Sequence, residues 1–112
     1  MSVVKINAIE VKEGLGPELE RRFAERERLV EKMPGFEGFE LLRPVSGESR
    51  YFVYTRWRSE EDFLVWVKSD EFKRGHAQQA QNAGRVAVSH GAKLLSFEVA
   101  QKAFPAVPSP VS

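Results

Sequence analysis

The sequence predicts an α+β fold in which two helices cover one face of a four-stranded antiparallel sheet. Four segments carry the β-branched, aromatic or alternating residues that are typical of strands. Two further segments carry apolar residues at helical spacing. Along the chain the order is β-α-β-β-α-β, which is the ferredoxin-like, split βαβ arrangement.

The first strand and the first helix are expected within residues 3–35. Val3 to Val11 (VVKINAIEV) is rich in β-branched residues and places apolar side chains on both faces. In the following EGLGPELERRFAERERLVEKMPG, Pro17 suits a first helical turn. The apolar residues of this segment recur about every 3.6 residues: Leu19, Phe23, Val30 and Met33. The pattern indicates an amphipathic helix that ends at Pro34-Gly35.

A hairpin and a second helix are expected next. Phe36 to Val45 and Arg50 to Trp57 read as strands, and the turn-forming SGES lies between them. Ser59 has the features of an N-cap, with Asp62 three residues later, and an apolar stripe of Phe63, Trp66 and Val67 follows. The second helix, or a shorter continuation of it, runs through SDEFKR and is interrupted at Gly75.

The last strand is expected over Lys93 to Gln101. Residues 1–102 therefore form a single domain, because 112 residues bury one modest core. Residues 103–112, with three prolines and few residues to pack, are expected to be a flexible C-terminal tail.

Composition favours an ordinary globular protein over a disordered or membrane one, with 42% hydrophobic and 29% charged residues. The net charge is +1 and the signs are interspersed, so nothing indicates a nucleic acid partner. Cysteine is absent, which excludes disulfides and thiolate chemistry. No signal peptide or membrane span is visible, and we expect a cytoplasmic protein.

The expected sheet has apolar residues on both faces. Tyr51, Val53 and Thr55 alternate with Phe52, Tyr54 and Arg56, and the first strand is apolar on both sides. Two helices cover only one face, and monomers rarely expose a large apolar surface to water. We therefore expect a homodimer in which two sheets pack together.

Common catalytic motifs are absent from the sequence, including G-x-S-x-G, the Walker loop, G-x-G-x-x-G and H-E-x-x-H. The glutamates of the first helix alternate with arginines and read as a solvated face. Three residues need an explanation. Asn7 interrupts a Val/Ile strand, and it is either a satisfied sheet amide or a donor into a pocket. Trp66 is either core or a pocket wall, and His76 is either a surface residue or a ligand. His90 reads as structural or exposed.

Together, Asn7 in INAIE, Trp66 in DFLVWVKSDEF and His76 in KRGHAQQ resemble the signature of IsdG-type haem-degrading monooxygenases. These belong to the antibiotic-biosynthesis monooxygenase superfamily of dimeric α+β barrels. The resemblance covers nearly the whole chain except the tail, and it is nearest to actinobacterial members.

The resemblance implies a role for each of the three residues. It implies that His76 is the axial ligand of the haem iron, a role that suits a neutral imidazole. Asn7 is the distal amide, and Trp66 is the bulky wall that presses on and ruffles the macrocycle. Haem is then both substrate and cofactor, dioxygen is the oxidant, and electrons come from an external, unidentified reductase.

A flat apolar plate with two propionates also needs an apolar slot and a cation. Phe23 is a candidate slot residue, and Arg22 or Arg26 is a candidate partner for a propionate. Two alternatives stay open. One is a cofactor-independent monooxygenase that acts on a quinol or polyketide-type phenol in the same pocket, and the other is a non-catalytic dimer that binds haem.

Overall fold

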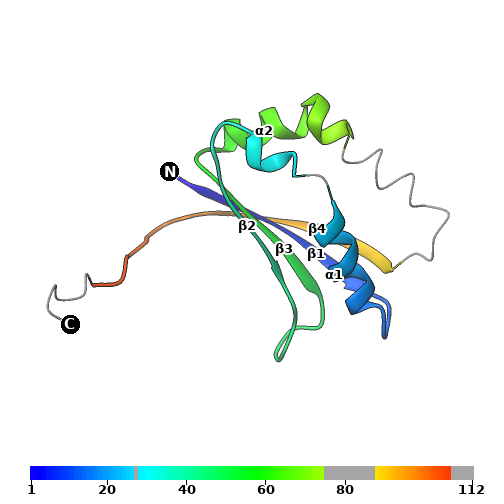
Figure 1. Ribbon diagram of the computed structural model, residues 1–112. Coiled ribbons are helices and arrows are strands. Elements are labelled where there is room, and N and C mark those ends of the chain that lie inside the picture. Colours follow the sequence, from blue (N-terminus) through cyan, green and yellow to red (C-terminus); the bar gives the residue numbers. More distant parts are fainter. Residues whose placement is uncertain (27, 75–87, 107–112) are drawn as a thin grey trace, which may run out of the picture.

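The computed structural model describes residues 1–26, 28–74 and 88–106. In chain order the elements are β1 (Val3–Val11), α1 (Gly16–Glu25), the short 3-10 helix η1 (Val30–Lys32), β2 (Phe36–Leu42), β3 (Tyr51–Trp57), α2 (Glu60–Val67) and β4 (Ser89–Glu98). The four strands form a sheet in the order β2-β3-β1-β4, and each neighbouring pair is antiparallel (Figure 1). The predicted ferredoxin-like arrangement is therefore confirmed.

Several element boundaries differ from the sequence-based expectation: β2 ends at Leu42 rather than Val45, β3 begins at Tyr51 rather than Arg50, and β4 ends at Glu98 rather than Gln101. The two largest differences are at the end of α1 and the start of β4. Helix α1 ends at Glu25, because Arg26 adopts an extended backbone and its N–H bonds to the Phe23 carbonyl. The apolar residues Leu29 and Val30 are nevertheless buried, at the start of η1. Strand β4 begins at Ser89, four residues before the expected start, because Ser89 pairs with Val11 of β1. The sequence SHGA there lacks the alternation that marks a strand.

The strand registers decide which residues share a face of the sheet. Lys5 of β1 bonds to Glu60 of α2, so the odd-numbered residues of β1 face the helices. The even-numbered residues Val4, Ile6 and Ala8 point to the opposite face.

Two core clusters lie at opposite ends of the helix-covered face. The α2-side cluster is built on buried Val3, Val30 and Trp57, with Met33, Phe36, Phe63 and Trp66 packed against them. The α1-side cluster is built on buried Leu19, Tyr51 and Val88, with Val11, Leu15, Phe23 and Leu41 packed against them. Figure 1 shows the same division, with α2 near the start of β1 and α1 near its end.

Helix α2 begins as its sequence predicts. Ser59 adopts an extended backbone, and its hydroxyl accepts a hydrogen bond from the Asp62 N–H at 3.1 Å. Asp62 also accepts from the Arg58 guanidinium, which holds the pKa of its carboxyl below the ordinary value. This cap fixes the start of the helix that carries Trp66.

The face of the sheet away from the helices is apolar, as the alternation predicts. It carries Ile6, Phe52, Tyr54, Leu95 and Phe97, and Phe97 is 51% exposed. Beyond β4, residues 99–106 form neither helix nor strand. The Val99 N–H still bonds to the Ser2 carbonyl at 2.9 Å, and the segment then leaves the sheet (Figure 1). Across the described ranges, no helix is long and apolar enough to cross a membrane.

Candidate functional site

The centre of the helix-covered face is a row of three residues from three neighbouring strands. Asn7 of β1 pairs with Val53 of β3 on one side and with Leu94 of β4 on the other, so the three side chains point the same way. We call this row the central rung. It lies between the two core clusters and belongs to neither. Leu94 is 55% exposed, while Asn7 and Val53 are partly buried.

Asn7 brings the polar group of this rung. Within the described ranges, no hydrogen bond joins its side chain to another residue. A sheet asparagine that is satisfied by its neighbours would have such a bond, and the two side chains beside it are apolar. The amide N–H and carbonyl are therefore available to a ligand on the helix-covered face.

Trp66 stands at the end of the face nearest α2. Its ring stacks on Trp57, with ring centroids 6.5 Å apart and planes 26° apart. The Phe72 ring lies nearly perpendicular to the Trp66 ring, with ring centroids 5.3 Å apart. Trp66 is only partly buried, whereas Trp57 is 0% exposed. Trp57 thus acts as the core residue, and it provides a rigid support for Trp66.

The Ser69 side chain links the end of α2 to helical residues 70–74. Its hydroxyl donates to the Trp66 carbonyl at 2.6 Å and accepts from the Phe72 N–H at 3.0 Å. The sequence-based alternative of a shorter helical continuation through SDEFKR is therefore the one observed. Gly75 and His76 lie outside the described residues, so the proposed iron ligand stays a prediction.

Phe23 and Arg26 of the predicted site both contact Phe39 of β2. The Phe23 and Phe39 rings stack with centroids 6.2 Å apart, and the Arg26 guanidinium carbon lies 4.3 Å from the Phe39 centroid. Arg26 also bonds to Glu31 at 3.3 Å. These contacts place one guanidinium and two aromatic rings at the α1 end of the helix-covered face.

Arg22 lies one turn before Arg26 and forms an ion pair with Glu18 at 2.9 Å. The hydrogen bonds from Arg21 and then Arg22 lower the pKa of Glu18 to about 2, so its carboxylate is charged at neutral pH. A ligand carboxylate would therefore share Arg22 with Glu18. An arginine has five N–H donors, which allows such sharing.

Lys5 is a residue of this face to which the sequence analysis gave no role. It is 6% exposed, and its ammonium bonds to Glu60 and Ser96. Strand alternation already places this lysine on the face of Val3 and Asn7, but only the structure shows that the face meets Glu60 of α2. It lies between Asn7 and the α2-side cluster.

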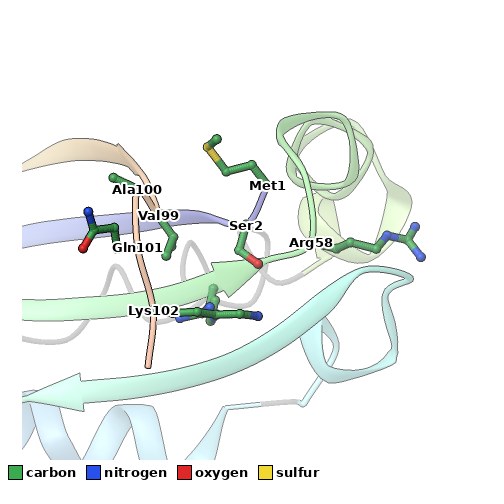
Figure 2. A pocket seen from close by; sticks show the side chains of 8 residues that line it. Met1, Ser2, Arg58, Val99, Ala100, Gln101 and Lys102 are labelled. Atoms are coloured by element: carbon green, nitrogen blue, oxygen red, sulfur yellow. The ribbon is translucent and has the colours of Figure 1, made fainter. Parts of the chain in front are cut away.

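A separate hollow of about 320 Å³ opens where the start of β1, the end of β3 and the segment after β4 meet (Figure 2). Three of its lining residues are basic, although most of the lining surface is apolar: Met1, Ser2, Arg56, Arg58, Val99, Ala100, Gln101 and Lys102. It contains none of the predicted site residues. Arg56 and Arg58 are paired with Glu37 and Asp62, respectively.

The helix-covered face therefore combines the groups that a flat, largely apolar ligand with acidic substituents requires. Val53 and Leu94 give an apolar floor, and aromatic rings flank it at both ends. The Asn7 amide supplies a hydrogen-bond donor, and Arg22 and Arg26 supply positive charge. Of the sequence-predicted residues in the described ranges, the structure places all five on this side of the sheet.

Comparison with known proteins gives a family match. Residues 2–78 match the family described as antibiotic biosynthesis monooxygenase. The chain is 56% identical over 99 residues to a protein of Mycobacterium tuberculosis named heme oxygenase (mycobilin-producing), a match that covers 88% of this chain and 90% of that protein. It is 35% identical over 79 residues to a heme-degrading monooxygenase of Bacillus thuringiensis, covering 69% and 73% of the two chains.

A solved structure is similar to this chain in both fold and sequence. It is the heme-degrader MhuD from M. tuberculosis with two hemes bound in its active site. The TM-score is 0.71 and the sequence identity is 53%, and the similarity covers 91% of this chain and 99% of that one.

Proposed function

Because this chain belongs to the antibiotic biosynthesis monooxygenase family, we propose that it is a haem-degrading monooxygenase. It takes haem, dioxygen and electrons from a separate donor and yields a linear tetrapyrrole and free ferrous iron. The observation that carries the proposal is the central rung, where an amide with no side-chain hydrogen bond to the described residues lies between two apolar side chains, on the face that both helices flank. Residues 1–102 carry the reaction, and the expectation of a cytoplasmic protein stays a prediction.

The substrate haem supplies the iron at which dioxygen is reduced. Val53 and Leu94 bind the apolar plate and exclude water from one of its faces. The Asn7 amide donates a hydrogen bond to dioxygen as negative charge develops on it. Such a donor acts most strongly where water is excluded, because the local dielectric is low.

Trp66 forms the bulky wall of the site. Its stack on the fully buried Trp57 resists displacement, so a macrocycle pressed against it has to distort instead. Phe23 provides the slot at the α1 end, and Arg22 and Arg26 bind the propionates, with His76 as the iron ligand. The role of His76 rests on the family resemblance alone. The roles of Phe23, Arg22 and Arg26 rest on the needs of a flat ligand with two propionates and on their place at the α1 end of the helix-covered face.

The proposal includes a homodimer in which the helix-free faces of two sheets pack together. Ile6, Phe52, Tyr54, Leu95 and Phe97 form the apolar part of that face. Burial of this surface by a second copy removes it from water, which stabilises the pair by about 25 cal/mol for each Å² of apolar area.

A haem titration followed by reduction tests the function. We expect a saturable shift of the Soret band on binding, and loss of that band with iron release when a reductant and air are supplied. His76→Ala should abolish the shift. A protein that never binds haem would instead point to a cofactor-independent monooxygenase, and binding without loss of the Soret band would indicate a non-catalytic haem-binding dimer.

A further inference from the structure

We propose that Lys5 is a positioning residue that sets the height of α2, and therefore of Trp66, above the strand that carries Asn7. The inference concerns the geometry of the apo protein. Its consequence for haem degradation rests on the function proposed above.

The Lys5 ammonium connects three elements. Its Nζ lies 2.7 Å from Glu60 Oε2 in the first turn of α2 and 3.0 Å from Ser96 Oγ of β4. It also lies 4.7 Å from the centroid of the Phe63 ring. Since Lys5 itself belongs to β1, one side chain ties α2 to two neighbouring strands.

Burial makes this connection sensitive to geometry. Lys5 is 6% exposed, and a buried ammonium is tolerated only when it is paired and hydrogen-bonded. A displacement of α2 away from the sheet would separate Nζ from both Glu60 and the Phe63 ring. The cost of leaving that charge without partners opposes the displacement.

The contacts of Lys5 lie on the same face of α2 as Trp66. Glu60, Phe63 and Trp66 are spaced three residues apart, and residues at this spacing are neighbours on a helix surface. The ring centroids of Phe63 and Trp57 are 5.8 Å apart, and Trp66 stacks on Trp57. Holding Glu60 and Phe63 against the sheet therefore holds Trp66.

The backbone of Lys5 supports the same tryptophan pair from the strand side. Its carbonyl accepts a hydrogen bond from Thr55 Oγ1 at 3.2 Å. Thr55 Oγ1 in turn accepts from the Trp57 indole N–H at 3.0 Å. Lys5 therefore contacts α2 through its side chain and is linked to Trp57 through its backbone carbonyl and Thr55.

Asn7 is the next residue on this face of β1. Two residues along a strand span about 7 Å, so Lys5 fixes the wall and the amide donor relative to each other across one short distance. The space between them is the space that a planar substrate would enter. We infer that its width depends on the Lys5–Glu60 pair.

The first experiment uses the apo protein and Lys5→Met, which keeps most of the side-chain volume and removes the charge. The stacked Trp57–Trp66 pair reports the position of α2 through its near-UV circular dichroism. We expect a changed near-UV spectrum with an unchanged far-UV spectrum, and partial recovery in Lys5→Arg. Should Lys5→Met fail to fold, Glu60→Gln serves instead, because that side chain is 48% exposed.

The second experiment measures haem degradation by the same variants. A displaced wall should lower kcat by roughly ten- to a hundredfold while KM changes little, since small misplacements are felt mainly in the reacting geometry. Arg50→Met is the matched control: Arg50 also pairs with a carboxylate, Glu48, and lies over a ring, Phe52, but it lies just before β3 and far from α2 along the sheet. It should leave kcat and the tryptophan spectrum unchanged.

The outcomes separate this inference from the proposed function. A folded Lys5→Met or Glu60→Gln protein with the wild-type near-UV spectrum overturns the positioning role. A changed spectrum with wild-type kcat shows that α2 moves without consequence for the reaction and overturns the catalytic part. If the wild-type protein itself leaves haem intact, the proposed function fails, and the apo measurement still decides the role of Lys5.

Discussion

The indole N–H of Trp57 donates a hydrogen bond to the hydroxyl of Thr55, two residues earlier in β3, at 3.0 Å. Trp57 is 0% exposed, so water cannot replace this acceptor. Thr55→Val keeps the shape of the side chain and leaves the indole N–H unsatisfied. We expect the free energy of unfolding to fall by about 1–3 kcal/mol in urea titrations. Thr55→Ser retains the acceptor, and a loss as large in Thr55→Ser as in Thr55→Val would contradict the role of the hydrogen bond.

Asn7→Ala separates turnover from binding. Loss of the amide donor should reduce the rate of haem degradation by about a hundredfold, while the apolar floor still binds haem. The rate of Soret loss after reduction measures turnover, and a haem titration measures binding. Leu94→Ala, on the same rung, should show the reverse, with weaker binding and a smaller change in rate. Haem degradation at the wild-type rate by Asn7→Ala would remove Asn7 from the reaction.

Trp66→Phe replaces the wall by a smaller ring that can still pack on Trp57. We expect less distortion of bound haem, visible as a changed absorption spectrum, and slower turnover. Phe72→Leu is a useful comparison, because the Phe72 ring packs perpendicular to Trp66 and does not take part in its stack on Trp57. Unaltered spectrum and turnover in Trp66→Phe would count against the wall assignment.

Glu20 should make folding stability depend on pH in the acid range. Hydrogen bonds from Arg43 and then Tyr51 lower the pKa of its carboxyl from 4.5 to about 2. A carboxyl with a lower pKa in the folded state stabilises that state above the unfolded pKa, and this contribution disappears as the pH falls through the folded value. The stability difference between wild type and Glu20→Gln should therefore be constant above about pH 5 and shrink between pH 4.5 and pH 2. Urea unfolding at several pH values measures it. Glu13→Gln, on the exposed turn before α1, is the control. A stability difference between wild type and Glu20→Gln that does not shrink at low pH would contradict the role of the Glu20 hydrogen bonds to Arg43 and Tyr51.

Phe97→Glu tests the proposed dimer. Phe97 is 51% exposed on the helix-free face, and burial of a carboxylate there against the partner sheet would carry a large desolvation cost. We expect a monomer in analytical ultracentrifugation, whereas Val45→Glu should leave the dimer intact, because Val45 is 91% exposed in the turn between β2 and β3. A wild-type sedimentation profile for Phe97→Glu would place the interface elsewhere.

The fold was predictable from the sequence because its signals are repeated over whole elements. The β-branched run of β1 and the cap at Ser59 each agree with the observed structure. The predicted end of the first helix was wrong. The apolar spacing continues through Leu29 and Val30, although the backbone leaves the helix at Arg26. Periodicity reports which residues are buried and does not distinguish an α-helix from a short 3-10 helix that buries the same residues.

The site was only partly predictable for a different reason. Asn7 and Trp66 attract attention as single residues, since one is polar in an apolar strand and the other is large. Val53 and Leu94 read as ordinary strand residues, and their place beside Asn7 depends on pairings between segments far apart in the chain. The role of Lys5 likewise depends on Glu60, 55 residues away.

The two core clusters are separate from the residues that face the proposed ligand. The two clusters hold much of the buried core on the helix-covered face, while the central rung belongs to neither and stays partly exposed to a ligand. Changes at Val53 or Leu94 would therefore alter the shape that the chain accepts at little cost to its fold. A protein built in this way can acquire a new ligand without first being restabilised, so one scaffold can serve many substrates.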